Sequence, residues 1–196
     1  ADYLQETWAQ PMPPFPVDDG MVSGRIEDES GKFNLNDLVG ADGTTVNDDA
    51  KKLFEQLLRR VGLPVELSQS TIDWIDSDDL TVGSMGAESN YYQGLSPGYT
   101  SANAPFNAIE DLKQVRGFEG GNYDLIAPYL SALPATTVKI NINTAPSLLL
   151  ASLDEKLDVN TVATVLQEKQ KKMEHFANVG ELLAVQPFDS MSDEGK

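Results

Sequence analysis

The sequence predicts an α+β protein in which helices are inserted between strands. Three observations support this class. Alternating apolar residues between positions 20 and 38 predict a β-hairpin, and a similar alternation at 137–143 predicts a later strand. Between them the chain has helical periodicity, which is clearest at 47–64. This order, with helices grouped between strands, argues against a parallel α/β sheet.

The composition is that of a globular protein with a large excess of acid. Of 196 residues, 40% are hydrophobic, and 31 acidic residues against 14 basic ones give a formal net charge of −17. Such a surface repels nucleic acid and anionic membranes and attracts hard cations. The chain has no cysteine, which excludes disulfides and thiolate metal sites. It contains no apolar run near the roughly 18 residues that span a bilayer.

The first segment predicts an extended linker followed by the hairpin. Four prolines fall between positions 11 and 16, and proline disfavours helix at its own position and at the residue before it. Apolar residues then alternate with polar ones at 22–26 and again at 33–35, with the turn-forming sequence "DESG" between the two runs. We therefore expect strands on either side of this turn.

The clearest helix is expected at 47–64. Asn47 or Asp48 can cap its start, and Arg59 and Arg60 suit its negative end. Gly62 and the proline two residues later stop it. A second, short helix is expected from about position 68 to 75. The apolar residues of the first helix fall at steps of three and one and form a single stripe: Ala50, Leu53, Phe54, Leu57, Leu58 and Val61.

Residues 76–107 show little periodicity, and an irregular segment of this length is uncommon unless it is functional or held by a ligand. Its start, "DWIDSDD", crowds carboxylates around Trp74 and Ile75, which we expect to anchor in the core. Calcium takes about six to eight oxygen ligands. The spacing is not that of an EF-hand loop, which would need an oxygen ligand at Leu80 and glycine at Thr81. Two interpretations remain open: a solvated acidic turn and a divalent-cation site.

The second half of the chain predicts several short helices and one strand. "FNAIEDLKQV" (106–115) and "FANVGELLAV" (176–185) each place Glu three residues after Asn, which is a capping-box arrangement. An apolar helical piece is expected to end at Pro134, and the strand at 137–143 would place Val138, Ile140 and Ile142 on one face. Helices are then expected from Thr144, as a cap, and at 158–172.

Two rival functions deserve comparison. "KININTAPSLLLASL" and the later "FANVGELLAV" are similar to helix-hairpin-helix modules, whose nucleic-acid-binding members present hairpin amides to phosphate. Here the connection "DEKLDV" carries Asp154, Glu155 and Asp158 and no glycine, so DNA binding is not expected. An acid-dependent hydrolase would need two facing carboxylates, and no particular pair stands out. His175, the only histidine, is expected on a helix surface.

Six motifs taken in order resemble type II secretion system protein K, a family of minor pseudopilins. They span the chain from about Thr7 to Val185: "WAQPMPPFPVDDG", "GRIEDESGKFNLNDL", "DWIDSDD", "GAESNYY", "NAIEDLKQV" and "KININTAP". The resemblance implies a pilin-like antiparallel sheet core with a large α-helical inserted domain, the N-terminal transmembrane helix of the family being missing here. It also implies three regions: 1–41 with the core, linker and first hairpin, 42–135 with the insertion and acidic loop, and 136–196 with the return strand and helix-hairpin-helix-like helices.

The same resemblance implies a non-enzymatic role at the tip of the periplasmic pseudopilus. The partners would be minor pseudopilins I and J, the pseudopilus below them and, as a further option, secreted substrate. Family members are anchored in the bacterial inner membrane by the N-terminal helix, with the soluble domain in the periplasm. Nucleic acid is not an expected partner.

The resemblance further implies structural calcium, one or two ions, bound in the insertion. Asp73 is expected to point away from the site, because it lies on the preceding helix. The ligands that the resemblance implies are Asp76, Asp78, Asp79, Glu88 and Asn103.

Overall fold

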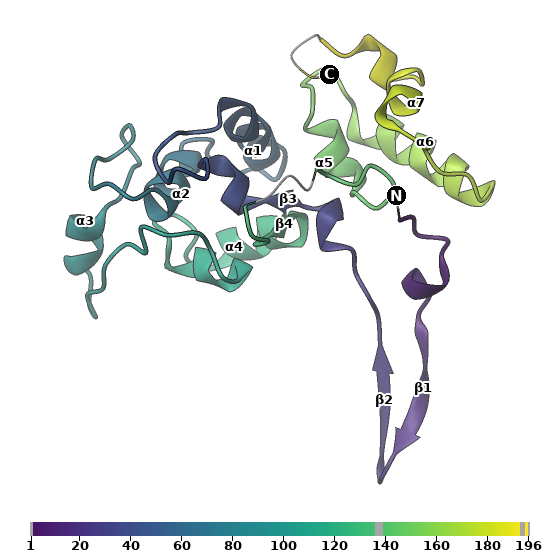
Figure 1. Ribbon diagram of the computed structural model, residues 1–196, viewed down its shortest axis with the longest axis horizontal. Helices are drawn as coiled ribbons and strands as arrows, with labels where there is room; N and C mark the ends of the chain where they lie inside the picture. The colour runs from purple at the N-terminus through teal and green to yellow at the C-terminus, as the bar shows by residue number, and fades with distance from the viewer. Residues whose placement is uncertain (1, 136–138, 193–194, 196) are drawn as a thin grey trace.

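The computed structural model describes residues 2–135, 139–192 and 195, which form a two-stranded ribbon and two helical lobes (Figure 1). The ribbon (residues 12–24) projects away from both lobes. We call residues 31–135 the first lobe and residues 139–192 the second lobe. Among the described residues, no helix is both long and apolar enough to cross a membrane. The mixture of helices with small sheets agrees with the predicted α+β class.

The ribbon pairs β1 (Met12–Val17) with β2 (Gly20–Gly24) in antiparallel fashion, with Phe15 opposite Val22. The predicted linker at 11–17 is therefore wrong, because this segment is a strand. Pro16 pairs with Met21 in the register. Proline fits such a position because β1 lies at the edge of a two-stranded ribbon, where an outward-facing amide is not needed for pairing.

The hairpin predicted over 20–38 is also wrong. The "DESG" sequence forms a 3₁₀ turn, η2 (Glu29–Gly31), in which Asp28 accepts a hydrogen bond from the Ser30 amide. The chain therefore continues into the first lobe instead of reversing. There β3 (Phe33–Asn34) pairs in parallel with β4 (Leu130–Ser131), which lies close to the last residues of that lobe in the sequence. Alternation alone correctly indicated extended segments but not their partners.

Two helices of the first lobe are confirmed. The Asn47 side chain accepts from the Ala50 amide and caps α1 (Asp48–Arg60), whose apolar stripe is buried at Phe54, Leu57 and Leu58. Helix α2 (Leu67–Ile75) is buried along almost its whole length, because it lies between α1 and the rest of the lobe.

The rest of the first lobe contains short elements. The helix expected at 106–115 is a 3₁₀ helix, and the carboxylate that closes its start is Asp111, which accepts from the amides of Asn107 and Ala108. The apolar piece before Pro134 contains a helix but ends in β4. The short elements are η3 (Leu35–Leu38), α3 (Ser89–Gln93), η4 (Ile109–Gln114), α4 (Gly121–Ile126) and η5 (Ala127–Tyr129).

The second lobe contains the predicted C-terminal helices. They are α5 (Ser147–Ala151), α6 (Val159–Lys171) and α7 (Val179–Leu183), followed by η6 (Phe188–Ser190). Asp158 caps α6 through the Thr161 amide, and Asn178 caps α7 through the Glu181 amide. Thr144 is not the cap of α5, because its Oγ1 donates to Asp28 Oδ2 at 2.7 Å.

The strand predicted at 137–143 is not formed by its described residues, 139–143, and Val138 lies outside the described residues. The Asn141 amide donates to the Ser30 carbonyl at 2.8 Å, and the Asn141 side chain donates to Asp28. The alternating Ile140 and Ile142 pack against the core instead of continuing a sheet. This segment thus ties the start of the second lobe to the base of the ribbon.

One buried amide side chain joins three segments of the first lobe. Asn36 is 2% exposed, and its Nδ2 donates to the carbonyls of Phe106 and Leu133 while its Oδ1 accepts from the Phe106 amide. These three hydrogen bonds lie in a buried position, so the backbone groups of the two distant segments depend on this residue for their partners.

We expect Asn36→Ala to lower the free energy of unfolding by about 3 kcal/mol or more, because it leaves buried backbone groups without partners. Urea denaturation monitored by tryptophan fluorescence would measure the change. Asn90→Ala is the matched control, since Asn90 is exposed. Equal stability of the two variants would contradict this role for Asn36.

Candidate metal centre

Three buried carboxylates meet where α2 ends and α3 begins. Asp73 lies in the last turn of α2, Asp76 follows its end, and Glu88 immediately precedes α3. One oxygen of each lies within 4.8 Å of the others. The three side chains are 0%, 4% and 3% exposed, respectively. Concentrated negative charge in a buried position is costly unless a cation or protons compensate it.

Several oxygens of this region have no hydrogen-bond partner in the part of the chain that the structure describes. Asp76 Oδ1 and Glu88 Oε1 are buried and unpaired, and so is Asn103 Oδ1. Buried acceptors are nearly always satisfied in folded proteins. Carboxylate and amide oxygens are the ligands that calcium prefers. These unpaired oxygens therefore fit a bound hard cation.

The irregular segment closes over the carboxylates through one backbone contact and one side-chain contact. The Val82 amide donates to Asp73 Oδ1 at 3.0 Å, and the Ser101 hydroxyl donates to Glu88 Oε2 at 3.3 Å. A Cβ atom at Gly86 would lie 2.5 Å from Asp73 Oδ2 and 2.5 Å from the Val82 carbonyl oxygen. Only glycine therefore lets the segment approach this closely.

Burial and mutual repulsion raise the pKa of these three carboxyls. Burial raises the pKa of Asp73 to about 6. Burial, followed by the charges of Asp78 and Asp73, raises the pKa of Asp76 to about 7. Burial, followed by the charges of Asp73 and Asp76, raises the pKa of Glu88 to about 7. A divalent cation would lower the pKa of these carboxyls again, because it favours their ionised forms.

The structure brings some of the predicted ligands together and leaves others apart. Asp76 and Glu88 belong to the carboxylate cluster. Asn103, at a positive φ of 45°, donates through Nδ2 to the Asp78 carbonyl at 2.9 Å. The Asp78 carboxylate accepts from the Leu80 amide at 2.7 Å, and Asp79 is exposed. As metal ligands, all five residues stay predictions.

The expectation for Asp73 is wrong. Asp73 and Asp76 are three residues apart, and side chains at this spacing lie on the same side of a helix. Because α2 ends just before Asp76, the two carboxylates remain neighbours. The three-residue spacing in "DWID" could have revealed this pair. Trp74 and Ile75 between them are both 4% exposed and anchor in the core, as expected.

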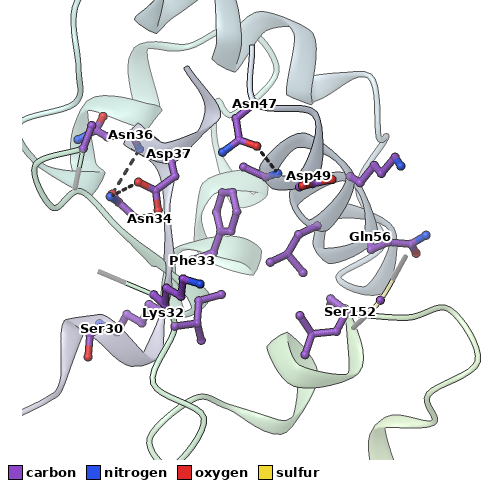
Figure 2. Close-up of a pocket in the computed structure, with 18 of the residues that line it drawn as sticks. Ser30, Lys32, Phe33, Asn34, Asn36, Asp37, Asn47, Asp49, Gln56 and Ser152 are labelled. Carbon is purple, nitrogen blue, oxygen red and sulfur yellow. Dashed lines mark hydrogen bonds between the residues drawn. The ribbon is translucent and has the colours of Figure 1, made fainter. Parts of the chain in front are cut away.

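A larger cavity lies elsewhere, between the two lobes (Figure 2). This groove of about 1160 Å³ contains none of the predicted ligands. Phe33 and Leu53 contribute to its apolar lining, and polar side chains such as Asn34, Asp49 and Gln56 surround them. It is a separate feature from the carboxylate cluster.

Comparisons with known proteins agree on one family. Residues 31–135 and 140–196 both match families described as Type II secretion system (T2SS), protein K. The chain is 36% identical over 184 residues to Type II secretion system protein K of Aeromonas hydrophila, covering 86% of the chain and 56% of that relative. It is 40% identical over 159 residues to the Pseudomonas aeruginosa protein of the same name, covering 79% and 46%.

The chain therefore spans about half the length of the curated relatives it matches. The same fold occurs in a solved structure, the GspK-GspI-GspJ complex from the type 2 secretion system of enterotoxigenic Escherichia coli. The match has a TM-score of 0.81 at 24% identity and covers 99% of the chain and 69% of the solved one.

We predict that, with divalent cations removed, stability falls as the pH rises from about 5 to about 8. A carboxyl whose pKa is higher in the folded protein favours folding while it is protonated. The contribution of Asp73, Asp76 and Glu88 is thus complete below their unfolded pKa, near 4, and is lost as the pH rises through about 6 to 7. Thermal unfolding in chelator at both pH values would measure the loss.

Asp76→Asn should flatten this pH dependence, whereas Asp124→Asn should preserve it. Asp124 is exposed, and its substitution removes the same formal charge as Asp76→Asn. Asp124→Asn therefore controls for the general repulsion within an acidic protein. A midpoint that rises with pH in chelator would contradict the prediction.

Proposed function

The chain belongs to the type II secretion system protein K family, and we propose that it is a minor pseudopilin that ends the pseudopilus at its tip. In this proposal it acts in the periplasm, anchored to the inner membrane by an N-terminal helix, as an assembly component and not as an enzyme. The observation that carries the proposal is the match of both lobes to one family, at 31–135 and 140–196.

The shape of the molecule supports a terminating role. The ribbon is a narrow extension, and the lobes form a wide body beyond its base (Figure 1). A filament grows when each subunit leaves room for the next one, so a subunit that carries a wide body at its outer end stops addition. Secreted substrate would meet this body first.

Minor pseudopilins I and J are the proposed partners. The solved protein that shares this fold is described as part of a complex with GspI and GspJ. We propose that the chain forms the corresponding complex, with the remaining pseudopilus below it. The three subunits would place the wide body of this chain at the outermost position.

We also propose that one or two structural calcium ions hold the segment 76–107. Asp73, Asp76 and Glu88 would supply carboxylate oxygens to one ion, and Asn103 would supply an amide oxygen. Asp78 and Asp79 follow directly on the same loop and would bind a second ion or complete the first. The ion would neutralise buried negative charge and use oxygens that otherwise lack partners.

A nucleic-acid-binding function has less support. The connection between α5 and α6 carries Asp154, Glu155 and Asp158, so a phosphate there would meet negative charge. The formal net charge of −17 also repels the phosphate backbone of nucleic acid.

Calcium at about 100 times its dissociation constant should stabilise the protein by about 2.7 kcal/mol, or roughly 5–10 °C in the unfolding midpoint of a chain of this size. Asp76→Asn should weaken calcium binding at least about tenfold, because it removes a charged ligand. Calorimetric titration and thermal unfolding with calcium or chelator would measure both effects.

Asp124→Asn, at an exposed site, is the matched control and should bind calcium as the unaltered chain does. Asp78→Asn and Asp79→Asn test whether these two carboxylates contribute. Chelation that changes neither the midpoint nor the protease resistance of 76–107 would refute structural calcium.

Co-expression with the periplasmic domains of pseudopilins I and J should yield one complex that co-elutes in size-exclusion chromatography. Double-stranded DNA at low salt, where electrostatic binding is strongest, should not shift the elution of the chain. Separate elution of the three proteins would argue against the assembly role, whereas salt-sensitive DNA binding would favour the rival one.

A further inference from the structure

We propose that Arg60 is a latch that holds the second lobe in a fixed orientation on the first lobe and thereby sets the shape of the groove between them. The latch consists of the Arg60 guanidinium and the hairpin that joins α5 to α6, residues 152–158. It depends neither on calcium nor on a partner protein, so it goes beyond the proposed function of the chain.

The contact is a forked one. Arg60 is the last residue of α1, and its Nη2 donates to the Asp154 carbonyl at 3.0 Å and to the Leu157 carbonyl at 2.8 Å. A guanidinium is planar and always charged, so it can bind two acceptors in one fixed geometry. Arg60 thus joins residues that are 94 and 97 positions apart in the sequence.

The guanidinium is partly withdrawn from water at this contact. Its Nε is buried and has no hydrogen-bond partner among the described residues. Burial lowers the pKa of Arg60, whereas the charges of Asp158 and Asp154 oppose that effect. A partly buried cation that leaves one donor unpaired is costly. A specific contact explains this position of the Arg60 guanidinium better than a general preference for arginine at a helix end.

The hairpin is organised in advance to receive the cation. The Asp154 carboxylate accepts from the Lys156 amide at 2.9 Å and from the Ser192 amide and hydroxyl at 2.6 and 2.7 Å. Asp158 caps α6. With the carboxylates engaged in these bonds, the carbonyls of Asp154 and Leu157 are turned toward α1, and the hairpin presents acceptors where a phosphate-binding hairpin would present amides.

Apolar contacts press the lobes together, and Arg60 adds direction. Leu57 and Leu58 of α1 belong to the same buried cluster as Leu149, Leu150 and Leu157 of the second lobe. Apolar packing tolerates sliding and rotation, since it is not directional. Two hydrogen bonds from one rigid group are directional, so they resist sliding and rotation of the lobes.

The latch acts directly on the groove. Asp49, Leu53 and Gln56 of α1 line the groove, and so do residues 152–156 of the hairpin. Because Arg60 joins this same helix to this same hairpin, its two hydrogen bonds fix how these two parts of the lining lie relative to each other. The pocket in Figure 2 is therefore expected to be a persistent feature of the protein in solution.

The test compares Arg60→Met with Arg59→Met in the full chain. Arg59 is the adjacent residue, is exposed and contacts only Gln56 through a described side-chain hydrogen bond, so its removal controls for charge and for α1 stability. Because the chain has no cysteine, Asp124→Cys on α4 and Gln167→Cys on α6 can carry dyes on exposed helical positions of the two lobes. Single-molecule energy transfer then reports the distribution of distances between the lobes.

We expect Arg60→Met to broaden this distribution and to raise amide hydrogen exchange at 153–158 about tenfold, the equivalent of one lost hydrogen bond to a charged donor. Arg60→Lys, which keeps the charge but not the fork, should give an intermediate result and guards against a failure of Arg60→Met to fold. Arg59→Met should match the unaltered chain. If Arg60→Met or Arg60→Lys lowers only the unfolding midpoint, with distances and exchange unchanged, the latch is refuted.

Discussion

The repulsion among three buried carboxylates is the constraint on which the first lobe depends. Asp73, Asp76 and Glu88 approach within 4.8 Å of one another, and each like-charged pair at such a distance is unfavourable by a few kcal/mol at the effective dielectric of a protein. The segment 76–107 buries few apolar side chains of its own, so its conformation depends on how this charge is compensated. Trp74 and Tyr92, in edge-to-face contact at 5.2 Å, supply its main apolar anchor.

A second polar centre explains two sequence motifs that the carboxylate cluster leaves aside. Asp28 accepts from the Ser30 amide and hydroxyl and from the side chains of Asn141 and Thr144. A Cβ atom at Gly31 would lie 2.6 Å from Thr144 Oγ1. The "DESG" and "NINTA" sequences therefore meet in space, where they fasten the base of the ribbon to the start of the second lobe.

Local signals predicted more than non-local ones. The apolar stripe, the cap and the stop residues of α1 all lie within one segment, and so the helix was predicted with its ends. The hairpin prediction failed because a strand of alternating residues contains no information about its partner, and a turn sequence such as "DESG" also suits a 3₁₀ turn capped by Asp28. At the candidate site, the crowding of acids left a solvated turn and a cation site both open, and the family resemblance supplied Asp76 and Glu88 as ligands. Asp73 was not expected at the site, because its position beside Asp76 depends on where α2 ends.

The parts of this molecule are oriented mainly by polar contacts and not by a continuous sheet. Asp28 fastens the ribbon, Asn36 joins distant segments of the first lobe, and Arg60 joins the lobes. Apolar burial supplies most of the free energy of folding but little direction, whereas a satisfied buried polar network specifies a unique arrangement. In the proposed role at the end of a filament, the body would have to resist the next subunit with a defined shape. Placing directional bonds at each joint is a physical means of giving short helices and an irregular loop that stiffness.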